Sequence, residues 1–146
     1  MKKVSKSLEE TEKISKDFVS KLPATSNKLK ATLVGLHGDL GAGKTTFMKG
    51  IAKAFGIEED ITSPTFIIEK LFKLKAREFD HLIHIDAYRL ESSRELLNLG
   101  WKEISENPKN IIFIEWPEKV SDILPKEMQH IYFKHVDETT REISFE

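Results

Sequence analysis

Residues 38–45 read GDLGAGKT and fill every fixed position of the phosphate-binding pattern G-x-x-x-x-G-K-[ST]. Glycines let backbone N–H groups converge on phosphate oxygens, because a Cβ would block their approach or forbid the required backbone angles. Lys44 supplies a positive charge for the β- and γ-phosphates, and Thr45 offers a hydroxyl to Mg²⁺. A helix that begins here adds free N–H groups and the positive end of its dipole.

The flanking segments decide between a phosphate-binding loop and a glycine-rich turn that matches the pattern by coincidence. Residues 31–37 have the composition of a buried strand. Between residues 47 and 55 the larger apolar side chains recur at helical spacing and form one stripe. Strand, loop and helix in this order are the context that the motif requires, so the sequence predicts a nucleoside phosphate site.

The rest of the chain alternates between helical and strand patterns. A helix is expected from Ser7 to about Leu22, and the helix after the phosphate loop is expected to end near Phe55 and Gly56. The other expected elements are strands at 66–68, 81–85 and 111–114, a short helix at 93–99, and a hairpin of 131–136 with 142–145. The pattern predicts one domain over residues 1–146. Its α/β fold would be P-loop NTPase-like, with a mixed, mostly parallel sheet, an antiparallel C-terminal hairpin, and flanking helices.

Composition excludes several classes of function. The 23 basic and 24 acidic residues give a net charge of −1, which argues against autonomous nucleic-acid binding driven by overall charge. Without cysteine there is neither a disulfide framework nor a thiolate metal site. No segment resembles a secretory signal or approaches the length of a membrane span, so a cytoplasmic protein without a membrane partner is expected.

Phosphoryl transfer needs an acid that holds metal and a group that orients the attacking water. Asp86 and Glu115 each follow an apolar strand, and the carboxyl ends of neighbouring strands are where such groups gather. Glu115, after four consecutive apolar residues, is the first choice for the Walker-B role of holding Mg²⁺ directly or through water, and it could also orient the attacking water. The alternative is a helix cap or a solvated turn residue, the usual role of an isolated acid at a strand end. The position of Asp86 supports equally a functional role and a structural pair with Arg89.

Several other residues have two interpretations. Ser63, Pro64 and Thr65 could form a switch loop, although their composition alone favours an ordinary turn. Trp116 could pack on the core, stack on a base or contact a partner, and burial is the commonest fate of such a residue. The run 70–75 indicates a strand with a solvated cationic face, with a basic docking surface as the alternative. The five histidines show no metal-binding spacing and are interpreted as ordinary strand residues: His37, His81, His84, His130 and His135.

Four motifs together resemble the TsaE (YjeE) family of small bacterial P-loop ATPases. They occur in the family's order and are residues 38–47, 63–66, 84–90 and 114–117. The resemblance implies an Mg²⁺-dependent ATPase with ATP as substrate. It also implies a role in forming N6-threonylcarbamoyladenosine at position 37 of tRNAs that read ANN codons. The implied partner is the TsaB–TsaD transferase complex, through which tRNA would be reached indirectly.

The resemblance also implies individual roles. Thr45 and Glu115 would be the Mg²⁺ ligands, and Trp116 would follow the Walker-B acid as it does in the family. Lys44, Asp86 and Glu115 would be catalytic, and residues 63–65 would be the switch loop. The nucleotide-binding residues would be Leu40, Gly41, Ala42, Gly43, Lys44, Thr45, Thr46, Asp86 and Arg141.

Water is the expected acceptor, with hydrolysis resetting or regulating the complex. The chain has few arginines for a lid of the nucleoside-kinase kind, so turnover should be slow alone and depend on the partner. The alternatives are a small-molecule kinase and a nucleotide-gated binding module. A GTPase would need a guanine-specifying N-K-x-D motif after the phosphate loop, and the sequence has none there.

Overall fold

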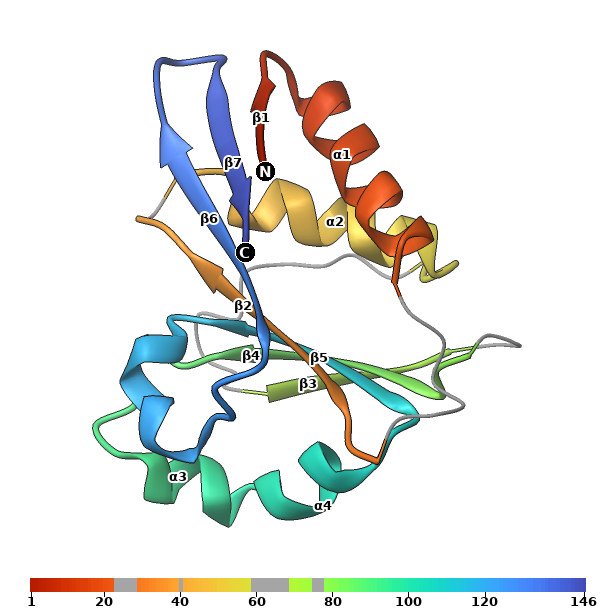
Figure 1. The fold of residues 1–146 in the computed structure, drawn as a ribbon, viewed down its shortest axis with the longest axis vertical. Coiled ribbons are helices and arrows are strands. Elements are labelled where there is room, and N and C mark those ends of the chain that lie inside the picture. The colour runs from red at the N-terminus through yellow and green to blue at the C-terminus, as the bar shows by residue number, and fades with distance from the viewer. Residues whose placement is uncertain (23–28, 40, 59–68, 75–77) are drawn as a thin grey trace.

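The strands form one seven-stranded sheet in the order β1-β7-β6-β2-β5-β4-β3 (Figure 1). The computed structural model describes residues 1–22, 29–39, 41–58, 69–74 and 78–146. The strands are β1 Lys2–Ser5, β2 Thr32–His37, β3 Glu69–Lys73, β4 His81–Asp86, β5 Asn110–Glu115, β6 Gln129–His135 and β7 Arg141–Phe145. The helices are α1 Leu8–Ser20, α2 Lys44–Ala54, α3 Ser93–Asn98, α4 Trp101–Glu106 and the 3-10 helix η1 Pro117–Ile123.

The middle of the sheet is parallel and its margins are antiparallel. β2 pairs with β5 and with β6 in parallel, and β4 pairs with β5 in parallel. At the margins β3 runs antiparallel to β4, β7 to β6, and β1 to β7. The predicted mixed α/β sheet with an antiparallel C-terminal hairpin is therefore confirmed. Every residue of β5 is buried, which explains its continuous apolar run.

Helices cover both faces of the sheet, as the apolar patterns predict. α1 and α2 pack on one face, where Phe47, Met48 and Ile51 meet Phe113 (Figure 1). α3, α4 and η1 cover the other face, where Trp101 and its neighbours form a second core. Since β-strand side chains alternate between faces, each central strand contributes to both cores. No helix in the described part of the chain is long and apolar enough to cross a membrane.

Local capping fixes the two helices of the first face. Ser7 caps α1 by accepting a hydrogen bond from the backbone N–H of Glu10 at 3.0 Å. α2 begins directly after Gly43 and ends at Phe55, followed by Gly56 with a φ of 77°. Both predicted helices are confirmed, although α1 ends at Ser20, two residues before the expected end.

Three described elements were not predicted. They are the edge strand β1 at residues 2–5, α4 at residues 101–106 and the 3-10 helix η1 at residues 117–123. In β3 the expected solvated cationic face is only partial, because Lys73 is exposed but the Lys70 ammonium lies over the Phe72 ring. The predicted strand at 66–68 lies outside the described residues.

Candidate nucleotide site

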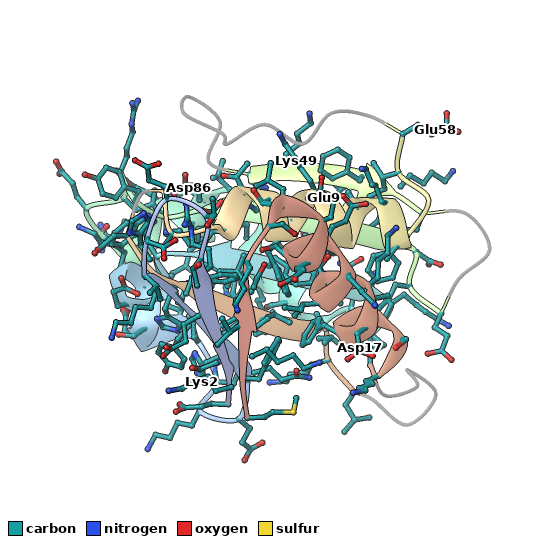
Figure 2. All side chains as sticks on the ribbon, turned by 90° about the horizontal axis from the view of Figure 1, so that it is seen from above. Lys2, Glu9, Asp17, Lys49, Glu58 and Asp86 are labelled. Carbon is teal, nitrogen blue, oxygen red and sulfur yellow. The ribbon has the colours of Figure 1, made fainter. Side chains whose placement is uncertain are left out.

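The phosphate-loop motif lies at the edge of the sheet where three parallel strands end. β2 stops at His37, directly before the motif, and α2 starts at Lys44, within the last two residues of the motif. In the sheet register Glu115 of β5 lies beside Leu36 of β2 on one side and Asp86 of β4 on the other. The fold thus brings the loop and the two predicted acids to one edge. In Figure 2, Asp86 lies toward the amino-terminal end of α2, and Glu58 lies beyond its other end.

The described part of the loop has the backbone conformation that its glycines allow. Gly41 and Gly43 have φ angles of 81° and 108°, a region that side chains with a Cβ rarely enter. The backbone N–H groups of the first turn of α2, including those of Thr45 and Thr46, precede the helical hydrogen-bond ladder. The side chain of Ala42, also in the loop, is buried. Together these features create a cradle of N–H groups at a helix start, a suitable place for an anion.

Lys44 and Glu115 form the buried centre of the site. Lys44 Nζ lies 3.9 Å from Glu115 Oε1, and only 4% and 5% of the two side chains are exposed. The ammonium also donates a hydrogen bond to the Gly38 carbonyl and lies 4.3 Å from the centre of the Trp116 ring. Burial lowers the pKa of Lys44, and the carboxylates of Glu115 and Asp86 oppose that shift.

Asp86 stands beside this pair with a raised pKa. Burial is the main cause of the shift, and the charge of Glu115 adds to it. A hydrogen bond from the backbone N–H of Tyr88, at 3.0 Å, opposes the shift. This bond forms a local turn that aims the carboxylate without consuming both of its oxygens. A half-buried acid beside a buried lysine and a second acid is typical of functional sites.

Trp116 has an unusual backbone conformation directly after Glu115. Its φ of 59° makes it the one residue other than glycine with positive φ among those described. Such a conformation is an outlier for a bulky side chain and often accompanies a functional site. The ring packs against the second core and lies 5.0 Å from the Tyr88 ring, in addition to its contact with Lys44. Trp116 therefore both packs on the core and lies in the site.

Arg141 reaches the loop from the C-terminal hairpin. It is the first residue of β7, and a Cβ at Gly43 would lie 3.5 Å from its Cγ. The Arg141 guanidinium donates hydrogen bonds to the carbonyls of Asp137 and Thr140, at 2.6 and 3.1 Å. The aliphatic part of the side chain thus covers the loop while its charge is held within the hairpin. Contact between Arg141 and a nucleotide stays a prediction.

His84 belongs to this site, and interpreting it as an ordinary strand residue missed this. Its Nε2 lies 2.7 Å from Glu115 Oε2, and both side chains are almost fully buried. The two-residue period of β4 places His84 on the same face as Asp86. This spacing was a usable signal in the sequence. Leu40, Ser63, Pro64 and Thr65 lie outside the described residues.

The oxygen donors at this edge suit a hard divalent cation. The Thr45 hydroxyl and the two acids are the ligand types that Mg²⁺ prefers. Within the described ranges, no three His, Cys, Asp or Glu side chains gather closely enough to hold an ion by themselves. Mg²⁺ usually takes one or two protein ligands and completes its shell with water and phosphate oxygens, so the Thr45 hydroxyl and one acid would be enough to hold it.

Comparisons with known proteins agree on one family. The family described as "Threonylcarbamoyl adenosine biosynthesis protein TsaE" matches residues 5–143. The tRNA threonylcarbamoyladenosine biosynthesis protein TsaE of Bacillus subtilis is 37% identical over 127 residues, which are 87% of this chain and 76% of that protein. The protein of the same name from Treponema pallidum is 36% identical over 115 residues, covering 79% and 82% of the two chains. The crystal structure of B. subtilis YdiB superposes with a TM-score of 0.72 at 31% identity, covering 99% of this chain and 83% of that one.

Proposed function

The chain belongs to the TsaE family of tRNA threonylcarbamoyladenosine biosynthesis proteins, and we propose that it is a P-loop ATPase acting with a TsaB–TsaD-type complex. One observation carries the catalytic half of this proposal. Lys44 of the phosphate loop and Glu115 at the end of the adjacent strand meet at 3.9 Å, and both side chains are almost fully buried. Family membership supports the other half, the choice of partner.

The chain's own residues suffice to bind and orient a triphosphate. Backbone N–H groups of residues 41–46 surround the phosphates, and Lys44 exchanges the Gly38 carbonyl for a phosphate oxygen. The Thr45 hydroxyl and Glu115 would hold Mg²⁺. When bound, the ion neutralises charge on the β- and γ-phosphate oxygens. Asp86, which lies beside Glu115 in the sheet register, would orient a water that attacks the γ-phosphorus, releasing ADP and phosphate.

The hydrogen bonds that hold the Arg141 guanidinium within its hairpin support slow turnover without a partner. Arginine charge at the transferring phosphate is worth roughly 10³–10⁵ in rate in related phosphoryl-transfer enzymes. The guanidinium of Arg141 is instead bonded to two carbonyls of its own hairpin. A partner that reorders this hairpin, or supplies a cation itself, would accelerate hydrolysis.

The test compares wild type with Lys44→Ala and Glu115→Gln in ATPase and pull-down assays, with and without the TsaB–TsaD complex. We expect slow hydrolysis by wild type alone and faster hydrolysis in the complex. Lys44→Ala should lose ATP binding, whereas Glu115→Gln should bind ATP and lose at least about 100-fold in turnover. Lys49→Ala is the matched control, because Lys49 is exposed on the same helix.

Three results would contradict the proposal. A phosphorylated metabolite would identify a kinase. Full tRNA modification by Glu115→Gln would identify a nucleotide-gated binding module. Partners that neither bind nor alter turnover would exclude the assignment to this complex, even if ATP binding survives.

A further inference from the structure

We infer that His84 is a positioning residue that orients the Glu115 carboxylate toward the metal and nucleotide. This inference rests on the proposed function, since it assigns a task to a residue beside the proposed Mg²⁺ ligand. His84 would not itself touch nucleotide or metal. Its role would be to select which oxygen of Glu115 remains available to them.

The two oxygens of Glu115 have different neighbours. Oε2 lies 2.7 Å from His84 Nε2, whereas Oε1 faces the ammonium of Lys44 at 3.9 Å. A carboxylate only accepts hydrogen bonds, so in this contact the tautomer with hydrogen on Nε2 donates a hydrogen bond to Oε2. The short contact therefore occupies one oxygen and leaves Oε1 directed at the phosphate-loop lysine. At 3.9 Å the contact between Lys44 and Oε1 is longer than a hydrogen bond, so an incoming ligand can replace it.

The surroundings of His84 argue against a role in core filling alone. Leu82, on the same face of β4, belongs to the apolar core beneath α2, and His84 itself is 2% exposed. A buried imidazole costs free energy unless it is hydrogen-bonded, and an apolar residue would pack here without that cost. The contact with Glu115 supplies the missing partner. Groups that orient metal ligands in this way typically change metal affinity by about 10–100-fold when removed.

The experiment measures Mg²⁺ affinity instead of activity. A fluorescent, non-hydrolysable ATP analogue is bound to wild type and variants, and Mg²⁺ is titrated to obtain its half-saturation concentration. His84→Leu should raise that concentration by about 10–100-fold, with nucleotide affinity in the absence of Mg²⁺ unchanged. His84→Gln can keep an N–H donor near the position of Nε2 and should restore most of the affinity. His84→Asn is too short to reach Glu115 and should not.

A double-mutant cycle and a control make the test specific. If His84 acts through Glu115, then His84→Leu added to Glu115→Gln should change Mg²⁺ affinity by less than about twofold. His81→Leu is the control, because His81 lies at the opposite end of the same strand. Thermal unfolding verifies that each variant is folded, and the Gln and Asn variants carry the test if the Leu variant is not.

Each outcome bears on one claim. Wild-type Mg²⁺ affinity in His84→Leu, equal losses in the Gln and Asn variants, or an undiminished effect in the Glu115→Gln background would overturn the positioning role alone. A wild-type protein that binds nucleotide with no dependence on Mg²⁺ would instead contradict the proposed ATPase, and this inference with it.

Discussion

Asp86 is a charged residue in surroundings that disfavour its charge. Burial and the nearby Glu115 carboxylate raise its pKa, so the folded state binds the proton more tightly than the unfolded chain does. Ionisation of Asp86 at neutral pH therefore opposes folding. Such a cost is typical of residues retained for function instead of stability.

Asp86→Asn should consequently stabilise the protein while abolishing hydrolysis. The amide oxygen can still accept the Tyr88 N–H, so the local turn is kept. We expect a gain of about 0.5–1 kcal/mol in the free energy of unfolding at pH 7, the size of typical stabilising substitutions. The gain should shrink as pH falls through the raised pKa toward about 3.9, below which both states are protonated. Urea unfolding at several pH values measures this, and a pH-independent difference would contradict it.

The pKa of His37 is shifted in the opposite direction to that of Asp86, below its ordinary value. Its Nε2 lies 2.9 Å from His130 Nδ1, and its ring stacks on Tyr132 at 4.4 Å. Burial lowers the pKa of His37; the charge of Glu118, 3.5 Å from Nδ1, opposes this, and His130 adds to it. Protonation therefore favours the unfolded chain.

Wild type should lose stability as pH falls below about 6.5, the ordinary pKa of histidine. His37→Gln should remove part of that loss, so the two unfolding free energies should converge between pH 7.5 and pH 5.5 if wild type is the more stable at pH 7.5. His135→Gln, at an exposed position of β6, is the control and should keep the wild-type slope. Parallel pH profiles for wild type and His37→Gln would refute the assignment.

At the scale of elements, α1 and α2 approach closely at one glycine. A Cβ at Gly50 of α2 would lie 1.8 Å from Ser15 Oγ and 3.1 Å from the Cα of Glu12. The Ser15 hydroxyl is held by a hydrogen bond to the Glu12 carbonyl at 2.6 Å, which limits its freedom to move away. Gly50 therefore sets the distance between the helix that carries the phosphate loop and the helix that covers it.

Gly50→Ala should destabilise the protein by about 1–3 kcal/mol, the usual cost of overpacking. The direction of the change in stability is informative, because alanine within a helix is otherwise about 1 kcal/mol more stabilising than glycine. Chemical denaturation measures the change, with the exposed Lys49→Ala on the same helix as control. Adding Ser15→Ala should recover part of the loss. A stabilised Gly50→Ala would show that the helices separate freely.

Elements whose pattern is local were predictable from the sequence, and those defined by a distant partner were not. β4 and β5 follow from apolar runs that end in acids, and this placed Asp86 and Glu115 beside the phosphate loop. β1 has only four residues with two lysines, and its strand character depends on β7, some 140 residues away. α4 was missed because Gly100 stops α3 and, with a φ of 88°, also starts the next helix.

The same distinction holds within the candidate site. Lys44 and the two acids come from motifs and strand ends, which the sequence displays. The spacing of His84 from Asp86 is a local signal, but the contact between His84 and Glu115 depends on the register of two strands. The residues around Trp116 likewise give no sign of its positive φ.

At the scale of the whole molecule, both ends of the chain meet in the β1–β7 ladder at one margin of the sheet (Figure 1). Phe145 donates a backbone hydrogen bond to the Met1 carbonyl at 2.8 Å, and Lys3 pairs with Asp17 of α1 at 3.0 Å. Ser5 lies opposite Arg141 in the ladder, and Arg141 in turn covers Gly43 of the phosphate loop. β1 therefore braces the hairpin that reaches the site.

Deleting residues 1–5 should lower both stability and nucleotide affinity. The ladder and the buried hydrogen bond between Ser5 and Thr11 are lost together, for which we expect at least about 2 kcal/mol at about 1 kcal/mol per net hydrogen bond. Lys2→Ala is the matched control, since it removes only the exposed pair with Glu142, worth at most about 1 kcal/mol. Urea unfolding and nucleotide titration are measured on the same samples at a temperature where the deletion variant stays folded. Weaker nucleotide binding by that folded variant would show that β1 supports the site by holding the hairpin, and with it Arg141, at the phosphate loop. Unchanged affinity would limit β1 to a role in stability and show that the hairpin holds Arg141 at the loop without it.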